Sequence, residues 1–449
     1  MAEDQNKKID ASPTKDFFIS ILVRDIKLVD AISDLVDNCV DGARRLRPDG
    51  NFNELHITLE AKPECFVIAD NCGGITAKIA REYAFRFGRP VNVDNTPHSI
   101  GRFGVGMKRA LFKIGEIIKI ESTAPDSKFV IDIDVDAWKN PAYVDEHGKE
   151  RWDFEFNTLE EHMNNPVKKC ETIITVTKLH EEIANEFKLE NFVTRLIASI
   201  EEAHQSAIGN GLQIVVNEID LKYRQSSLLS SKIIQPCFKT LGIQFKEKPV
   251  TVRIYAGISD AKLADAGWYV FCNDRLVLRA DKSQATGWDQ EINGVHMPKP
   301  HYQFARFRGY VFFDSDSADV LPWNTTKNGI NIESSLFQGA KLEMVNAMRP
   351  VIDFLNALDN EMDTESTALQ TKVNEAKPAL LRNITASTVF VYPKVTDTNM
   401  ANETPKEGRI SYLASYDKID RIKELTGCKT NPSVGLATFN YFLKSMGEE

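Results

Sequence analysis

The sequence predicts an α+β protein with more than one domain. Apolar residues between 28 and 36 recur at the three- and four-residue spacing of an amphipathic helix. Two short runs, 55–59 and 65–69, have the residue types of strands on either side of a turn. Several strand patterns between 212 and 313 are followed by a helical pattern over 336–358, which is typical of an α+β domain.

The composition limits the classes of function. At 449 residues the chain is long enough for roughly three domains. No apolar run approaches the ~18 residues that span a bilayer, so no membrane partner is expected. The net charge of −9 means that nucleic-acid binding would need a local basic patch. The seven cysteines form no C-x-x-C pair and no secretory segment opens the sequence, which favours a cytoplasmic location with reduced thiols.

Three polar residues on the first helix suggest chemistry. Asp34, Asn38 and Asp41 are spaced i, i+4 and i+7 and therefore share one helical face. The amide oxygen of Asn38 can complete a Mg²⁺ shell shared with phosphates and waters. The carboxylate of Asp34 can orient and deprotonate an attacking water. Taken alone, a solvated acidic face is the alternative interpretation.

The strand pattern over 65–69 runs directly into Asp70, which Gly73 and Gly74 follow. A carboxylate at a strand end can accept the exocyclic amine of adenine. The glycines let the backbone pass close to base and ribose, because they carry no Cβ atom. An ordinary Asn/Gly turn is the alternative for this segment alone.

A glycine loop precedes a second helical pattern that starts near Met107. Its residues are Gly101, Gly104, Val105 and Gly106. Free N–H groups at a helix N-terminus bind phosphates, and Lys108 can add a point charge there. We expect residues 76–99 to cover the nucleotide as a lid. A glycine-rich turn without ligand is the alternative, but the three segments together predict a site for ATP and Mg²⁺ without a Walker-type G-x-x-x-x-G-K-[ST] run.

One lysine far along the chain is a further candidate. Lys327 lies in a polar loop, 321–329, between a strand pattern and a helical pattern. From such a loop it could reach back to the γ-phosphate. In isolation it would be interpreted as a surface lysine.

These motifs resemble the GHKL superfamily, which includes gyrase-type topoisomerases, MutL, ninety-kilodalton heat-shock chaperones, MORC proteins and histidine kinases. The stretch 85–115 is most similar to MORC proteins, and Gly-Arg-Phe-Gly-Val-Gly is close to the chaperone branch. The segment 273–276 resembles the strand-turn of MORC and MutL proteins that carries an Asn and an Arg. The resemblance implies a GHKL α/β sandwich that binds ATP, followed by a transducer-like α+β domain and a small C-terminal helical module.

The resemblance also implies roles for the residues. Asp34 takes the position of the general base, Asn38 that of the Mg²⁺ ligand and Asp70 that of the adenine contact. The glycine loop takes the phosphate position, Thr172 that of the late pocket threonine, and Lys327 that of the second-domain lysine at the terminal phosphate. Asp34 is one methylene shorter than the usual Glu. Cys72 replaces a glycine, which would strain a backbone with φ > 0.

The predicted organisation is an ATP-binding domain over 15–185, a transducer-like domain over 186–350, a helical extension over 351–385, a linker over 386–408 and a C-terminal module over 409–449. A strand over 409–413 and two helices resemble a ribbon-helix-helix module, which dimerises and can enter a DNA groove. A helical dimerisation or docking tail without a DNA role is the alternative.

The function expected from the sequence is that of an ATPase. Mg²⁺-dependent ATP binding and slow hydrolysis would drive nucleotide-gated dimerisation, with the homodimer acting as a switch or clamp on DNA or on a protein client. The alternative is a nucleotide-binding scaffold, or a chaperone-like client binder, with little or no turnover.

Overall fold

A computed structural model describes residues 12–88, 97–101, 104–292, 294–324, 326–362, 368–385, 387–393 and 414–446. The chain forms two compact units, Met1–Pro393 and Lys394–Glu449. The predicted strand over 409–413, most of the predicted linker and residues 89–96 of the expected lid lie outside the described residues.

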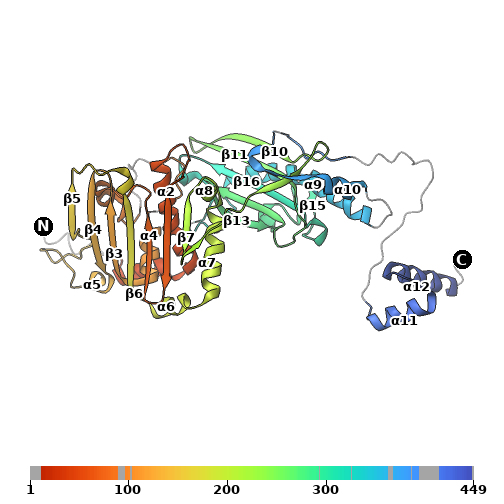
Figure 1. Ribbon diagram of the computed structural model, residues 1–449, viewed down its shortest axis with the longest axis horizontal. Helices are drawn as coiled ribbons and strands as arrows, with labels where there is room; N and C mark the ends of the chain where they lie inside the picture. The colour runs from red at the N-terminus through yellow and green to blue at the C-terminus, as the bar shows by residue number, and fades with distance from the viewer. Residues whose placement is uncertain are drawn as a thin grey trace, which may run out of the picture. The chain divides into compact units, whose positions relative to one another are not determined.

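A mixed sheet of eight strands forms the first half of the larger unit (Figure 1). Its strand order is β5-β4-β3-β6-β2-β1-β7-β8, and only the β1–β7 pair is parallel. Side chains along β1 alternate between exposed and buried, so helices cover one face of the sheet. The strands are β1 (His56–Lys62), β2 (Cys65–Asp70), β3 (Gly115–Thr123), β4 (Ser127–Asp134), β5 (Thr158–Glu161), β6 (Glu171–Leu179), β7 (Gln213–Val216) and β8 (Ile219–Asp220).

The helix predicted around 28–36 is confirmed as α2, which packs beside α4 and α7 in Figure 1. The predicted hairpin is also confirmed, because β1 and β2 pair antiparallel. None of the described helices combines the length and the apolar character that a membrane crossing requires. The helices are α1 (Lys15–Arg24), α2 (Leu28–Leu46), α3 (Ala77–Ile79), η2 (Ala80–Ala84), α4 (Gly106–Ile114), α5 (Val135–Lys139), α6 (Glu181–Phe187), α7 (Glu190–Ala203) and α8 (Gln205–Gly209).

The strand expected over 212–216 in the second domain belongs to the first sheet instead. It is β7, and it pairs in parallel with β1, with Thr58 opposite Val215. Helices α6, α7 and α8 form the crossover that a parallel partner requires. The first sheet therefore continues past residue 185, the expected end of the first domain. The sequence does not indicate this, because a pairing over about 150 residues leaves no local pattern.

The second half of the larger unit is a five-stranded sheet with the order β10-β11-β16-β12-β13. Helix α9 packs against β11 and β16, and it confirms the helix predicted over 336–358. Besides these, this half contains two two-stranded sheets, β14-β15 and β17-β9, and helix α10. The elements of this half are β9 (Ser227–Ser230), β10 (Cys237–Phe245), β11 (Lys248–Ile258), β12 (Gly267–Cys272), β13 (Arg275–Asp281), β14 (Gln290–Ile292), β15 (Val295–Met297), β16 (Phe307–Asp314), β17 (Lys377–Leu380), α9 (Ser335–Met362) and α10 (Ala368–Glu375).

The smaller unit, where described, is a helical hairpin of α11 (Tyr416–Thr426) and α12 (Asn431–Met446). The two helices expected from the sequence are confirmed, and the first ends at Gly427, which has the left-handed φ of 71° that favours glycine. Among the described residues of this unit only Val434 is buried. The hairpin therefore has almost no core of its own.

Candidate functional site

Apart from Gly73, all of the predicted site residues line one cavity between α2, the end of β2, the start of α4 and the loop around residue 327. Its space, including the open mouth, amounts to about 1350 Å³. Apolar side chains such as Leu35, Ile68 and Ile174 form part of the wall. An apolar wall with a few convergent polar groups is typical of a small-molecule site.

Asp70 and Thr172 lie opposite each other at one end of the cavity. They are directly paired in the register of β2 and β6, so their side chains point to the same face of the sheet. The Oδ1 atom of Asp70 accepts the backbone N–H of Cys72 at 2.8 Å. Burial raises the pKa of Asp70, and that N–H opposes the rise. The carboxyl group is thus fixed in place within a polar corner of the cavity.

The backbone strain expected at Cys72 is absent. Positive φ angles occur at the next two residues, Gly73 at 100° and Gly74 at 70°. A Cβ atom on Gly74 would lie 2.1 Å from the carbonyl oxygen of Thr123. The expectation was wrong because glycine supplies the unusual conformation one and two positions later.

Asp41 holds the start of the glycine loop. Its two carboxylate oxygens accept the backbone N–H groups of Ile100 and Gly101, each at 2.8 Å. Burial raises the pKa of Asp41, while Arg44 and the two N–H groups lower it. A Cβ atom on Gly101 would come within 3.2 Å of this carboxylate, so the loop passes very close to α2.

Lys108 has a different environment from the one expected. Its Nζ atom donates to three carbonyl oxygens, those of Ala84 at 2.9 Å, Arg86 at 2.6 Å and Gly104 at 2.5 Å. Burial lowers the pKa of Lys108 to about 7. The residue therefore ties the lid side of the cavity to the glycine loop, rather than presenting a free ammonium group to a phosphate.

Asp34 is almost fully buried between two cations. Its Oδ1 atom accepts from Lys327 Nζ at 3.1 Å, and its Oδ2 atom accepts from Arg109. Lys327 adopts a φ of 54°, and its backbone N–H donates to the carbonyl oxygen of Asn324 at 3.2 Å. A tight turn thus aims the lysine at α2.

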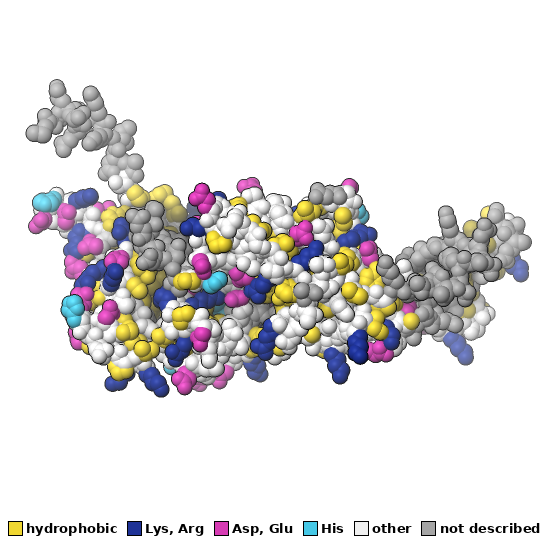
Figure 2. Space-filling model, turned by 90° about the horizontal axis from the view of Figure 1, so that it is seen from above, with side chains coloured by type: hydrophobic (Ala, Val, Ile, Leu, Met, Phe, Trp, Pro, Cys, Tyr) yellow, Lys and Arg dark blue, Asp and Glu magenta, His cyan; other side chains and the backbone are white. Residues whose placement is uncertain are grey.

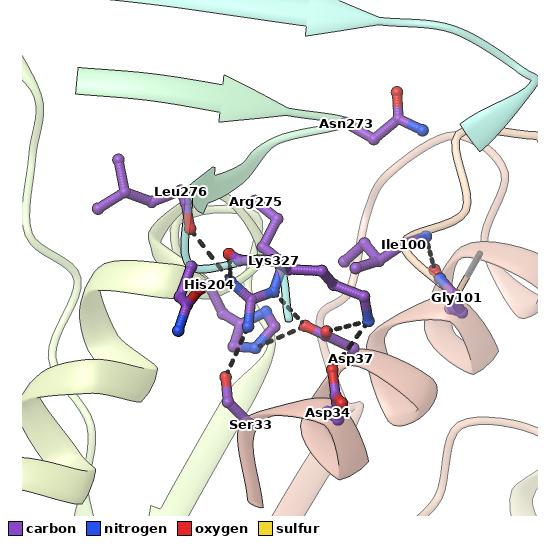
Figure 3. Close-up of polar contacts among 12 residues, drawn as sticks. Ser33, Asp34, Asp37, Ile100, Gly101, His204, Asn273, Arg275, Leu276 and Lys327 are labelled. Carbon is purple, nitrogen blue, oxygen red and sulfur yellow. Dashed lines mark hydrogen bonds and ion pairs between the residues drawn. The ribbon is translucent and has the colours of Figure 1, made fainter. Parts of the chain in front are cut away.

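Asp37 is the central residue that sequence reasoning missed (Figure 3). It is fully buried and meets Arg275 Nε and Lys327 Nζ, each at 2.6 Å, and His204 Nε2 at 3.3 Å. Burial raises the pKa of Asp37, but Arg275 and Lys327 outweigh this effect and hold the pKa well below its usual range. Asp37 therefore joins the first sheet's helix to two segments of the second domain.

His204 and Arg275 complete this network. Burial lowers the pKa of His204 to about 3, so the imidazole is neutral near pH 7. Arg275 directly follows a two-residue turn, Asn273 and Asp274, whose φ angles of 47° and 62° match the type I′ hairpin. Asn273 Nδ2 also donates to the carbonyl oxygen of Ser99 at 3.0 Å, next to the glycine loop.

Sequence patterns indicate only some of the residues in this network. The resemblance over 273–276 drew attention to the turn that carries Arg275, though not to its partner. Asp37 follows Asp34 by three positions, but no local pattern marks it as more than a charge on a helix. His204 and Arg109 carry no distinguishing sequence pattern at all.

The fold and the cavity define a class. A mixed sheet with helices on one face, and a cavity that brings acidic and amide side chains opposite a glycine loop, is consistent with a GHKL-type ATPase domain. Residues 26–164 match the model of the family described as histidine kinase-, DNA gyrase B-, and HSP90-like ATPase. This match supports the GHKL superfamily for that segment and implies that it binds ATP. No curated protein matches the chain.

Proposed function

We propose that the chain binds ATP with Mg²⁺ in this cavity and hydrolyses it slowly. The observation that carries the proposal is the cavity itself, which gathers the base-recognition end and the phosphate loop predicted from separate segments. The buried Oγ atom of Ser99, in the cavity wall beside that loop, has no hydrogen-bond partner in the described structure. A hydroxyl donor there fits a phosphate oxygen.

In the proposed complex each residue has a distinct task. Asp70 accepts the adenine amine, and Asp41 holds the glycine loop so that its following N–H groups face the phosphates. Mg²⁺ supplies positive charge to the phosphates when bound, and the amide oxygen of Asn38, which is exposed to the cavity, would hold it. The second sheet acts as a transducer, because Lys327 and Arg275 connect it to α2.

The pairing of Asp34 supports slow turnover. Both of its carboxylate oxygens already accept a hydrogen bond from a cation, so an attacking water has to compete with these contacts for the carboxylate. Lys327 must shift part of its contact from Asp34 to the terminal phosphate before Asp34 can receive a proton from water. The same observation favours a second candidate, a scaffold that holds ATP with little turnover.

The test separates binding from hydrolysis. Asp34→Asn is expected to reduce Mg²⁺-dependent phosphate release by roughly a hundredfold or more, because general bases contribute about 10²–10⁴-fold. ATP affinity, measured by calorimetric titration, is expected to stay within about threefold, since the substitution keeps the shape of the side chain. The control Asp25→Asn changes an exposed carboxylate just before α2 and is expected to leave both quantities unchanged.

Three outcomes would contradict part or all of the proposal. Unchanged phosphate release in Asp34→Asn would remove Asp34 as the base. Absence of ATP binding by the unmodified chain would refute the nucleotide site itself. ATP recovered intact after long incubation with the unmodified chain would favour the scaffold over the ATPase.

We also propose that the chain works as a homodimer joined by α12. Leu436, Phe439, Phe442 and Met446 fall within an arc of roughly 120° when successive residues are placed 100° apart. Their exposed fractions are 63%, 46%, 59% and 65%, and the arc lies away from the buried Val434. With the exposed apolar side chains of α11, Tyr416 and Leu425, they offer several hundred Å² of apolar surface, of the order of the roughly 800 Å² per partner found in stable complexes.

A second copy of the hairpin is the occupant that fits this face. The charges of the hairpin do not favour DNA, since α11 carries acidic and basic side chains in equal number: Asp417, Lys418, Asp420, Arg421, Lys423 and Glu424. Such a mixed helix does not repel its copy. Figure 2 likewise shows acidic and basic side chains interspersed on the face that it displays. Such a mixture favours a protein client over DNA. The proposed role is that of a cytoplasmic, MORC-like or chaperone-like switch.

Light scattering after size exclusion tests the dimer. The full chain is expected to be dimeric without nucleotide, and Phe439→Glu is expected to be monomeric because it places a charge on the apolar arc. A non-hydrolysable ATP analogue is then expected to restore a dimer of Phe439→Glu through the ATP-binding domains. Tyr441→Glu, outside the arc on the same helix, is the matched control. A monomeric unmodified chain would overturn the hairpin contact, and no shift with the analogue would overturn nucleotide gating.

A further inference from the structure

Arg109 has an unused donor that points to a ligand. It lies on α4, one helical turn after Gly106, and lines the cavity with only 8% of its surface exposed. One of its guanidinium nitrogens, Nη2, donates to Asp34 Oδ2. Its Nε atom is buried and has no hydrogen-bond partner in the described structure. An unsatisfied buried donor costs about 1–3 kcal/mol, so the site is built for an acceptor.

The other buried cations of the cavity are already engaged. Lys108 uses three donors on the carbonyl oxygens of Ala84, Arg86 and Gly104, which is all that an ammonium group has. Lys327 is shared between Asp34 and Asp37. Among the buried cations of the cavity in the described part of the chain, Arg109 is therefore the one that can donate to a ligand without breaking an existing hydrogen bond.

The geometry points to Arg109 as a residue that bridges Asp34 and the terminal phosphate of ATP, donating from Nη2 to the carboxylate and from Nε to a phosphate oxygen. This inference rests on the proposed ATP site. A guanidinium group can serve both anions at once because its N–H donors lie in a rigid plane. The bridge also keeps the short Asp34 carboxylate near the terminal phosphate, where the attacking water has to lie.

The ratio of ATP affinity to ADP affinity is the readout, because only ATP has the terminal phosphate. Arg109→Gln is expected to weaken ATP binding by roughly tenfold or more, the loss of one hydrogen bond to a charged group. ADP affinity is expected to change by less than about threefold, well under the 1.4 kcal/mol that a tenfold change represents. Arg109→Lys keeps a positive charge beside Asp34 but lacks the planar donors, so it is expected to recover only part of the ATP preference.

Two further variants separate a phosphate contact from a structural role. Asp34→Asn weakens the ion pair yet keeps the guanidinium, so its preference for ATP over ADP is expected to persist. Lys113→Gln lies on the same helix outside the cavity lining and is expected to change neither affinity. Circular dichroism and a thermal melt check that each variant is folded.

The outcomes are distinguishable. Equal losses of ATP and ADP affinity in Arg109→Gln, or the same loss of ATP preference in Asp34→Asn, would make Arg109 a structural partner of Asp34 and overturn the inference. An unmodified chain that binds neither nucleotide would instead refute the proposed function. An unmodified chain that prefers ATP, with Arg109→Gln and Arg109→Lys retaining that preference in full, would refute the bridge while leaving the ATP site intact.

Discussion

Asp37→Asn is expected to lower the free energy of unfolding by about 3–5 kcal/mol, the usual loss when a buried ion pair is left with one partner. The carboxylate is fully buried between Arg275 and Lys327, each at 2.6 Å. Asparagine keeps the volume but removes the charge, so two cations remain in the interior with Asp34 as the nearest carboxylate for Lys327. Urea unfolding of the full chain, followed by tryptophan fluorescence, measures the change.

Asp30→Asn is the matched control for this substitution. Asp30 lies on the same helix, is only half-buried and accepts from Asn328, in the same loop as Lys327. Its replacement is expected to cost no more than about 1 kcal/mol, as for an ordinary hydrogen bond. A loss of similar size in both variants would mean that the buried charge of Asp37 contributes little.

The pH dependence of this contribution follows from the pKa of Asp37. Because its folded-state pKa is below the ordinary value of 3.8, the stabilisation is fully present above that value and is lost as the pH falls toward the folded-state pKa. The difference between the unmodified chain and Asp37→Asn is therefore expected to stay constant between about pH 5 and 8.

The packing of residues 77–88 against Lys108 is expected to tighten as the pH rises above 7. In this packed (closed) arrangement burial lowers the pKa of Lys108 to about 7, whereas a lysine exposed by detachment of residues 77–88 (the open state) has its ordinary value of 10.5. Closing releases a proton between these two values, so a higher pH stabilises the closed state, by up to about 1.4 kcal/mol or tenfold per pH unit. Below pH 7 both states hold the proton and the dependence disappears.

Amide hydrogen exchange of residues 77–88, expressed as protection relative to the intrinsic rate at each pH, measures this closure. The unmodified chain is expected to gain protection between pH 7 and 9. Lys108→Met removes the titrating group and is expected to show no such dependence, whereas Lys113→Met on the same helix is expected to retain it. Protection that stays flat in the unmodified chain would mean that the three carbonyl oxygens keep the ammonium charged.

Local patterns in the sequence were sufficient for the secondary structure around the site. The i, i+4 spacing of Asp34 and Asn38 on an amphipathic helix, and the strand that ends at Asp70, depend on neighbours along the chain, and α2 and β2 confirm the helix and the strand. The glycines that begin α4 are visible for the same reason. Each of these features depends only on residues within one or two helical turns, or within one strand, of itself.

Most of the features that sequence reasoning missed depend on distant partners. Asp37 looks like Asp41 in the sequence, yet its environment is set by residues 238 and 290 positions away. The position of β7 beside β1 depends on a crossover of three helices. Cys72 was misjudged because φ angles shift by one or two residues without changing the composition of a turn. Long-range packing decided the first two, whereas Cys72 depends on the local conformation of its turn.

The place of β6 in the sheet determines which fragment of the chain can form the first sheet as a separate module. The family match ends at residue 164, but β6 (Glu171–Leu179) lies between β3 and β2 in the middle of the first sheet. A fragment cut at the end of the match would lose its central strand and split into two half-sheets with open edges. Recombination or truncation at that point would therefore remove a strand that the sheet needs, and the sheet is complete only beyond β8 (Ile219–Asp220).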